Sequence, residues 1–440
     1  MDAIETELDV MACRRQFPAL ERTNAGGPVV YLDGPAGSQT PRRVAEAVAH
    51  YLLTTNANHG GVFATARESD DLLREAHRAG AEFVGAADPG EIVFGANMTT
   101  LTLGLSRAIA RSWTAGDEVL VTRLDHDANV TPWALAARDA GAIARTVEFR
   151  DDCSLDMESF HRQLSPRTRL VAIGCASNAV GTINAVAEMA RAAHAVGALV
   201  YADAVHYAPH RLIDVAALEC DFVVCSAYKF FGPHVGVLWG KRELLERFTP
   251  YKVRPAANQI PDRWMTGTQS HEGIAGFLAA VDYLADLGRS LKPRATSATH
   301  ARAAASLPLA TGSCAASDSS RRGALVAAYA AIRRHEESLS RVMLAGLAAL
   351  PRYRTLGIAD AGRIEERVAT FGVTHSRRPA REVALHLAER GIFAWHGNFY
   401  ALSLSERLGL EPEGMVRLGL LHYNTREEVD RALAALAELD

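Results

Sequence analysis

Residues 226–233, "SAYKFFGP", place a lysine soon after the apolar run "DFVVC" of residues 221–225. An apolar run that gives way to a glycine and a proline is typical of a buried strand that ends in a turn. In open sheets of parallel strands, ligands bind beyond the carboxyl ends of the strands. Lys229 is therefore predicted to lie at the functional edge of such a sheet.

Short runs with strand-like composition recur from residue 91 onward. They alternate with longer segments of helical periodicity, such as residues 185–197, which stop at Gly197. This alternation predicts an α/β fold, with helices on both faces of a mostly parallel seven-stranded sheet. The predicted strands are residues 91–94, 118–122, 145–149, 169–174, 199–204, 221–226 and 235–239.

The chain is predicted to divide into two domains. Residues 31–289 form the large domain in this interpretation, and residues 323–440 form a smaller α+β C-terminal domain. Residues 290–322 are rich in Ala, Ser, Thr and Pro, which is typical of a connection or insertion. Residues 1–30 are expected to form an N-terminal segment that packs on the small domain.

Composition argues against several kinds of partner. The 47 Lys and Arg residues are outnumbered by 51 Asp and Glu residues, so the basic excess typical of nucleic-acid binding is missing. The six cysteines form no CxxC pair, which argues against a disulfide framework and a zinc ribbon. The acidic amino terminus and the lack of a long apolar run predict a cytoplasmic protein without a membrane partner.

Polar residues follow several of the predicted strands. Asp203 ends one strand and could cap a turn, or could hold a cationic ring nitrogen in its protonated form. His126, in "LDHDANVTPW", could stack on an aromatic ring or bind a metal together with neighbouring acids. Asn178, in "SNAVGTIN", follows another strand. Because these strand ends meet at one edge of a parallel sheet, the side chains are expected to gather there.

Two further stretches favour anionic ligands. The pattern of residues 94–102, "FGANMTTLT", predicts a strand, a glycine turn and the start of a helix. The free N–H groups of this helix start could bind a phosphate, or a side chain could simply cap them. Arg417 lies in an apolar, strand-like run and is expected to pair with a planar carboxylate of the protein or of a substrate.

These features together describe one ligand. That ligand has an aldehyde, a protonated flat ring and a phosphate, and it reacts with amino acids. Its expected partners are the lysine, the strand-end carboxylate, the stacking imidazole, the phosphate-binding helix start and the arginine. The sequence therefore predicts that the cofactor is pyridoxal 5'-phosphate (PLP).

The motifs also occur in the order found in a known family. From Tyr31 to the C-terminal "YNTREEVDRALAAL", the chain resembles class V aminotransferases of PLP fold type I, in their cysteine desulfurase and selenocysteine lyase branch. By this resemblance "SAYK" makes Lys229 the Schiff-base lysine and Ser226 a phosphate ligand. "DHDAN" makes His126 the residue that stacks on the pyridine ring, and "SNAVGTIN" makes Asn178 face cofactor and substrate.

The resemblance implies further roles. Asp203 would pair with the pyridinium nitrogen, and "GANMT" would bind phosphate through Asn97 and the N–H of Met98. "TGTQS" would bring Thr268 to the phosphate of another subunit, which implies a homodimer with shared active sites. Arg417 would bind the substrate α-carboxylate.

The chain departs from the family pattern near the cofactor. His206 stands where desulfurases commonly have glutamine, and Tyr228 stands where a histidine usually precedes the lysine. The loop at residues 393–410, "FAWHGNFYALSLSERLGL", aligns with the loop that carries the persulfide-forming cysteine but contains none. A thiolate nucleophile at that loop is indispensable for taking up sulfur as persulfide.

These observations predict an enzyme that binds an amino acid as an external aldimine, with Lys229 removing the Cα proton. The expected reaction is a cysteine desulfurase-like β-elimination of the C–S or C–Se lyase type, without a persulfide cysteine. Transamination and epimerisation of an L-amino acid are the alternatives. His59, His396 and Asn398 are the candidates for substrate selection.

A hypothesis from a different class is a metal-dependent hydrolase. No HxH or HExxH spacing supports it, so no metal is expected. Its ligands would come from His59, Asp125, His126, Asp127, His206 and His210.

Overall fold

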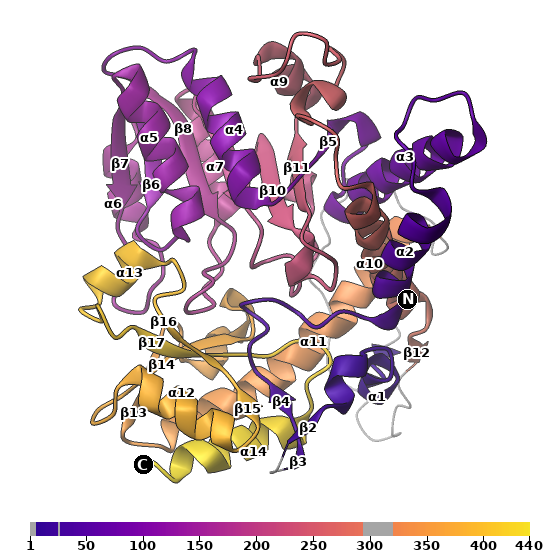
Figure 1. Ribbon diagram of the computed structural model, residues 1–440. Helices are drawn as coiled ribbons and strands as arrows, with labels where there is room; N and C mark the ends of the chain where they lie inside the picture. Colours follow the sequence, from indigo (N-terminus) through magenta and orange to yellow (C-terminus); the bar gives the residue numbers. More distant parts are fainter. Residues whose placement is uncertain (1–5, 25–26, 294–319) are drawn as a thin grey trace, which may run out of the picture.

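The structure, a computed structural model, describes residues 6–24, 27–293 and 320–440, and it contains a large and a small sheet stacked above one another (Figure 1). The large sheet has seven strands in the order β5-β11-β10-β9-β8-β6-β7. All neighbouring pairs from β10 to β7 are parallel, whereas β11 runs antiparallel to both β5 and β10. In sequence order the strands are β5 (Ile92–Gly95), β6 (Glu118–Thr122), β7 (Ile143–Val147), β8 (Thr168–Gly174), β9 (Leu199–Asp203), β10 (Phe222–Ser226) and β11 (Gly236–Gly240). The predicted α/β class and mostly parallel seven-stranded sheet are confirmed.

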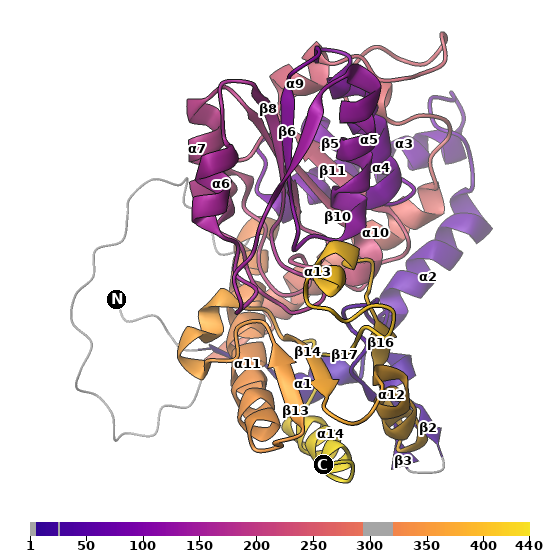
Figure 2. The same ribbon diagram turned by 90° about the vertical axis from the view of Figure 1, so that its left-hand side faces the viewer.

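Helices cover both faces of the large sheet, so its central strands read as continuous apolar runs. Every residue of β6, β10 and β11 is buried. The helices α6 and α7 lie on one face, and α4 and α5 lie on the other (Figure 2). Their bounds are α4 (Met98–Ala110), α5 (Thr131–Ala140), α6 (Met157–Gln163) and α7 (Val186–Ala195). The helix α7 ends two residues before Gly197, whose φ of 82° belongs to the left-handed region that glycine adopts readily.

Longer helices pack beside the sheet and connect it to the small one. The helix α10 packs against α2, α3 and α11, and all four contribute buried residues to the protein's core. Their bounds are α2 (Arg42–His50), α3 (Ala64–Val84), α10 (His271–Arg289) and α11 (Arg321–Ala348).

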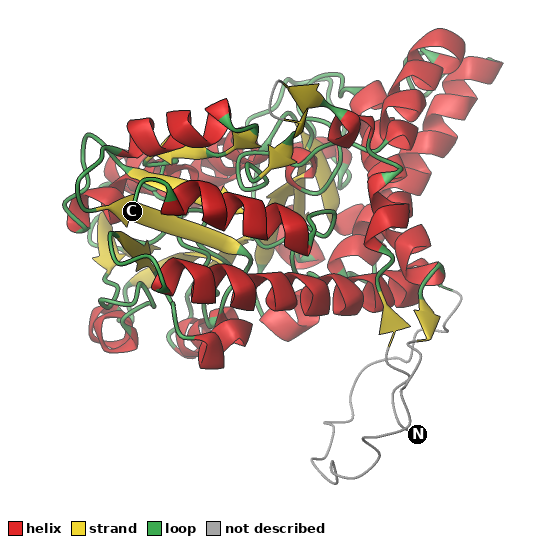
Figure 3. Cartoon of the chain, turned by 90° about the horizontal axis from the view of Figure 1, so that it is seen from below, coloured by secondary structure: helices red, strands yellow, loops and turns green. Residues whose placement is uncertain are grey.

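The small sheet is antiparallel and has the strand order β13-β14-β17-β16. The helices α11 and α12 pack on it and α14 packs against both of them, and the view from below shows helices in front of the strands (Figure 3). A separate core, which includes Phe371, Val373, Leu418 and Val429, lies between these helices and the strands. The bounds are β13 (Tyr353–Leu356), β14 (Thr370–His375), α12 (Ala380–Glu389), β16 (Trp395–Gly397), α13 (Leu402–Arg407), β17 (Met415–Gly419) and α14 (Arg426–Ala437).

The N-terminal chain contacts the small sheet's side of the molecule. The helix α1 (Val10–Arg14) ends in an arginine whose Nη1 lies 2.9 Å from Oε1 of Glu428 in α14. Farther along, β4 (Val30–Tyr31) pairs in parallel with β15 (Ile392–Phe393). The proposed domain boundaries stay predictions, and residues 294–319 of the predicted connection lie outside the described residues.

The two sheets face each other across the carboxyl ends of the large sheet's strands. The helix α13 lies between the two layers in both Figure 1 and Figure 2. Loops that follow β6, β8 and β9 therefore contact the small sheet's side of the molecule, where Tyr400, Arg417 and Thr370 meet them. None of the described helices is both long enough and apolar enough to span a bilayer.

Arg367 joins the two layers from a fully buried position, with 1% of its surface exposed. Its guanidinium donates to the carbonyl oxygens of Ile358 and Thr370, and it lies 4.3 Å from the ring centre of Phe371. Its backbone also forms a bridge with Thr182 of the large domain. Burial lowers the pKa of Arg367 to about 9, so the charge is retained at neutral pH.

We expect Arg367→Met to lower the free energy of unfolding by roughly 2–4 kcal/mol, because it leaves buried carbonyl oxygens without donors. Denaturant unfolding followed by circular dichroism measures this loss. The matched control is Arg381→Met on the exposed side of α12, which should change the value by no more than about 0.5 kcal/mol. Equal values for the two variants would contradict the prediction.

Candidate active site

A cavity lies at the carboxyl ends of the large sheet's strands. Every predicted cofactor-binding residue except Thr268 lines it, although these residues come from segments more than 130 positions apart. Its lining comprises Asn97, Met98, Thr99, Asp125, His126, Ala128, Gly174, Ala176, Asn178, Asp203, Val205, His206, Ser226, Tyr228 and Lys229.

Lys229 lies in the 3-10 turn that follows β10. Its Nζ donates to the carbonyl oxygens of Pro35 and Ala36, the latter at 3.2 Å. Burial, assisted by the positive charge of Arg417, lowers the pKa of Lys229 from its usual value to about 7. A substantial fraction of this amine is therefore neutral near pH 7, which is the form that acts as a nucleophile or a base.

Two carboxyl groups lie near the carboxyl ends of β9 and β6. Asp203 ends β9, and its Oδ1 accepts a hydrogen bond of 2.8 Å from the N–H of Val205. Burial raises the pKa of Asp203 to about 6. Burial and the charge of Asp203 raise the pKa of Asp125 to about 7. Gly174 permits this approach, because a methyl group there would lie 2.6 Å from Oδ1 of Asp125.

His126 is held by its neighbours in one orientation. Its Nδ1 accepts a hydrogen bond of 3.0 Å from the N–H of Ala128, which places the ring proton on Nε2. Its ring stacks on Tyr400, with the ring centres 5.4 Å apart and the planes at 22°. Burial and the nearby Lys229 lower the pKa of His126 to about 4, so the imidazole is neutral and suited to stacking.

The start of α4 lies at one end of the cavity and has the features of a phosphate-binding site. The N–H of Met98 donates to Oγ of Ser226 at 3.0 Å, while Asn97 caps the helix through the N–H of Thr100 at 2.8 Å. Gly236 in β11 makes room for this close approach, because a methyl group there would lie 2.5 Å from the carbonyl carbon of Asn97. The positive end of a 13-residue helix dipole is thus directed at the cavity wall.

Arg417 reaches the same region from β17 in the small sheet. Its Nη1 donates to the carbonyl oxygen of Asn178 at 2.9 Å, and its guanidinium carbon lies 3.9 Å from the ring centre of Phe399. Burial lowers the pKa of Arg417 to about 9, so it remains charged at neutral pH. Burial also raises the pKa of Asp33 to about 6, and its Oδ1 is buried without a hydrogen-bond partner.

Two polar atoms on the cavity residues have no partner. Asn178 donates through Nδ2 to the carbonyl oxygen of Phe399 at 2.9 Å, but its Oδ1 is unsatisfied. The Nε2 atom of His206 lies 2.9 Å from Oγ1 of Thr370, and its Nδ1 is unsatisfied. Buried polar atoms without partners indicate a missing ligand. The amine, the carboxylates, the flat imidazole, the helix start and these two atoms fit PLP.

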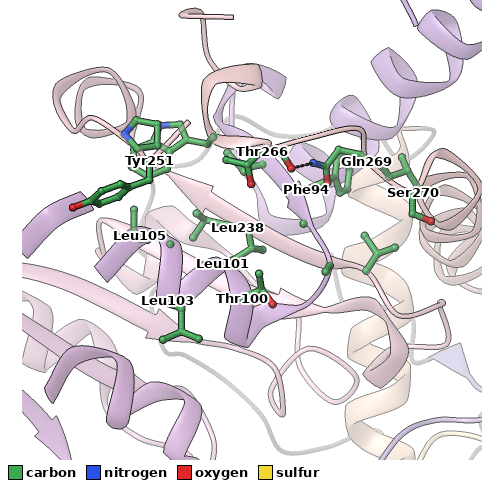
Figure 4. Close-up of a pocket in the computed structure, with 18 of the residues that line it drawn as sticks. Phe94, Thr100, Leu101, Leu103, Leu105, Leu238, Tyr251, Thr266, Gln269 and Ser270 are labelled. Atoms are coloured by element: carbon green, nitrogen blue, oxygen red, sulfur yellow. Dashed lines mark hydrogen bonds between the residues drawn. The ribbon is translucent and has the colours of Figure 1, made fainter. Parts of the chain in front are cut away.

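Thr268 and His59 lie apart from this cavity. Thr268 lines a separate open pocket of about 520 Å³ beside α4, where the side chain of Gln269 donates to the carbonyl oxygen of Thr266 (Figure 4). It also lines a second open pocket together with His59, whose side chain is 58% exposed. Within one chain, neither residue reaches Lys229's cavity.

The remaining candidates lie on the β16 hairpin. His396 is exposed on β16. The side chain of Asn398 is occupied by the turn itself, since its Oδ1 accepts from the N–H of Tyr400 and its Nδ2 donates to Oε1 of Glu411, both at 3.1 Å. A role for Asn398 in contacting substrate stays a prediction.

Three residues of the site were not predicted from the sequence. Phe399 and Tyr400 lie in the loop at residues 393–410, which contains no cysteine, and Asp33 lies in the turn "LDGPAG". The weak signal for Asp33 was an acid within a glycine- and proline-rich turn. Among the described residues, no group of three or more His, Cys, Asp or Glu side chains could hold a metal ion, so the hydrolase hypothesis has no ligand cluster.

Comparison with known proteins identifies the family. The family model described as "Aminotransferase class-V" matches residues 30–327 and 324–432. A probable cysteine desulfurase of Synechocystis sp. is 31% identical over 441 residues, which cover 96% of this chain and 94% of that protein. A cysteine desulfurase of Dickeya dadantii is 31% identical over 438 residues, covering 96% and 95% of the two chains.

Solved structures agree with this result. The apo cysteine desulfurase of Thermococcus onnurineus has a TM-score of 0.83 at 24% identity and covers 99% of both chains. The cysteine desulfurase CsdA of Escherichia coli has a TM-score of 0.79 at 25% identity, with coverage of 98% of this chain and 99% of that one. The chain belongs to the class V aminotransferase family, in its cysteine desulfurase-like branch with PLP fold type I, and is a PLP-dependent enzyme.

Proposed function

We propose that this enzyme removes a substituent from the β-carbon of an amino acid by a cysteine desulfurase-like elimination, as a C–S or C–Se lyase, without taking sulfur onto a cysteine of its own. The observation that carries the second half of this proposal is the loop at residues 393–410. It brings Phe399 and Tyr400, rather than a thiol, to the groups around the cavity. Desulfurase relatives support the first half.

The described cysteines offer no replacement nucleophile. None of them lines the cavity, and all five are buried. Burial raises the pKa of Cys13 and Cys220 to about 12 and that of Cys153 to about 11, and it raises the pKa of Cys175 and Cys225 as well. Thiols with raised pKa values and no access to solvent are poor nucleophiles. Cys314 lies outside the described residues.

The roles that we propose for the chain's own residues follow from their positions. Ser226, Asn97 and the N–H of Met98 would hold the phosphate, and His126 would lie flat against the ring. Asp203 would keep the ring nitrogen protonated, with Asn178, His206 and Tyr228 beside the cofactor. When bound, PLP supplies an electron sink for negative charge at the substrate's Cα. Arg417 would bind the α-carboxylate through its free edge and so orient the Cα–H bond.

The elimination itself requires one base and one leaving group. Nζ of Lys229 takes the proton from Cα, and the bond from Cβ to the substituent breaks with its electron pair leaving on the substituent. For a β-substituted alanine, addition of water then gives pyruvate, ammonia and the protonated substituent. No oxidant or reductant is consumed in this balance.

Product analysis tests the proposal. Purified holoenzyme is incubated with L-amino acids and with alanines that carry a thiol, selenol, sulfinate or other leaving group at Cβ. We expect pyruvate and the free substituent in equal amounts, without sulfur bound to the protein. Formation of a keto acid that retains its β-substituent would establish transamination instead, and loss of optical activity without other products would establish epimerisation. A Lys229→Ala control should form no product.

The low pKa of Lys229 makes a separate prediction for cofactor uptake. Only the neutral amine attacks an aldehyde, so PLP binding by the cofactor-free protein should accelerate with rising pH and level off above about pH 7–8. Stopped-flow absorbance after mixing with PLP measures this rate. Arg417→Gln removes the nearby positive charge and should move the midpoint to higher pH. A rate that still rose about tenfold per unit near pH 10 would contradict the prediction.

We also infer a homodimer in which Thr268 and His59 complete the partner's cavity. Both residues line a pocket away from their own Lys229, and Val253 in the same pocket is 68% exposed. Val62 and Phe63, which follow closely after His59 in the sequence, are 89% and 57% exposed. Exposed apolar side chains of this kind are typical of a protein interface.

Sedimentation should therefore give a particle of two 47.4 kDa chains. Val62→Asp combined with Phe63→Glu should shift the mass toward one chain and weaken PLP binding. Val326→Asp on the exposed face of α11, where Val326 is 48% exposed, is the matched control and should leave the mass unchanged. A fully active particle of 47.4 kDa would overturn this inference.

A further inference from the structure

The turn after β16 carries two aromatic residues in an unusual backbone conformation. Phe399 has a φ of 57° and Tyr400 a φ of 59°, in the left-handed region that residues other than glycine adopt rarely. Such a conformation persists when the surroundings enforce it, and it often occurs at functional sites. Two adjacent residues of this kind therefore call for an explanation from their contacts.

The first aromatic ring lies against the predicted carboxylate-binding residue. The guanidinium of Arg417 lies 3.9 Å from the ring centre of Phe399, which is the distance of a close cation–π contact. Because the ring covers a face of the guanidinium, it leaves the edge with its N–H groups available. One of these groups already donates to the carbonyl oxygen of Asn178, which fixes the plane from a second direction.

The second ring lies against the predicted cofactor-stacking residue. Tyr400 and His126 are stacked with their planes at 22°, while Tyr400 as a whole remains 72% exposed. The contact uses the face of the phenol ring, because the interplanar angle is small. A cofactor ring on the opposite face of His126 would make the imidazole the middle layer of three.

The backbone of the same two residues is bonded to the large domain. The carbonyl oxygen of Phe399 accepts from Nδ2 of Asn178 at 2.9 Å. The carbonyl oxygen of Tyr400 accepts from the N–H of Asp127 at 2.7 Å. Each aromatic residue thus makes two contacts, one to a site residue through its ring and one to the large domain through its carbonyl group. The left-handed turn allows the two residues to make these four contacts at once.

We propose that Phe399 and Tyr400 are paired positioning residues, of which Phe399 sets the plane of Arg417 for an α-carboxylate and Tyr400 holds His126 flat for the cofactor ring. The proposal rests on the proposed function only in placing PLP and an amino acid in this cavity. It holds equally for elimination, transamination or epimerisation, so its test is independent of the reaction type.

The Phe399 arm measures binding without turnover. An α-methyl amino acid carries the carboxylate but has no Cα–H bond to lose, and the matching amine lacks the carboxylate. Both are titrated into holoenzyme, with the visible spectrum of the cofactor as the signal. Phe399→Ala should raise the Kd of the amino acid roughly tenfold, within the range of a buried cation–π contact, and leave that of the amine unchanged. Phe399→Tyr should restore tight binding.

The Tyr400 arm measures the cofactor before any substrate is added. The visible circular dichroism of bound PLP reports the asymmetry of its surroundings. Tyr400→Leu should reduce this signal, and Tyr400→Phe should retain it, because the contact uses the ring face and not the hydroxyl group. In a His126→Ala background, Tyr400→Leu should cause no further change if it acts through His126.

A structural defect gives a different pattern in both arms. The unfolding midpoint of each variant is therefore measured as well. The matched control is Leu385→Ala in α12, where the native leucine is 50% exposed, and it should change neither signal. Equal weakening of amino acid and amine by Phe399→Ala, or no weakening of either, overturns the role of Phe399. An unchanged signal in Tyr400→Leu, or an equal change without His126, overturns the role of Tyr400.

Discussion

The burial of two cationic groups close enough to influence each other is the constraint on which the rest of the site depends. Lys229 and Arg417 come from the two different sheets. In addition to the effect of burial, the positive charge of Arg417 lowers the pKa of Lys229, and both charges lower the pKa of His126. Removing both charges from water is costly unless anions compensate them. Asp203 and Asp33 supply part of this compensation, but burial raises their own pKa values. A ligand that carries a phosphate and a carboxylate, such as the proposed PLP-bound amino acid, would supply the rest.

The same constraint explains why the two layers must be fixed relative to each other. Lys229 lies in the turn that follows β10 and Arg417 lies in β17, so a small shift between the sheets would separate the amine from the guanidinium. Arg367 bonds carbonyl groups at this junction, and the turn after β16 adds hydrogen bonds from Asn178 and Asp127. These contacts are buried or partly buried, where hydrogen bonds are strongest.

The sequence predicted the large sheet well because its strands are buried on both faces. The strand at residues 118–122 matches β6, whereas the edge strand β7 covers 143–147 instead of 145–149. Ile143 is 46% exposed, and Phe149 pairs with Leu155 outside the sheet, so the apolar pattern misplaced the strand. Site residues at strand ends could be predicted because parallel strands gather them. Phe399 and Tyr400 could not, since their conformation depends on contacts more than 200 positions away.

The departures from the desulfurase pattern fall into two physical classes. His206 and Tyr228 replace their counterparts without adding charge: burial keeps the pKa of His206 well below its usual value, and the Tyr228 ring lies 5.0 Å from Nζ of Lys229. A protonated histidine at either position would place a third cation beside Lys229 and Arg417. These two residues therefore add no positive charge beside Lys229 and Arg417. The loop at residues 393–410 is different, because it contains no cysteine and brings the rings of Phe399 and Tyr400 against Arg417 and His126. Under the proposed function, the fate of the leaving group changes in this chain, while the groups proposed to bind the cofactor and the α-carboxylate are retained.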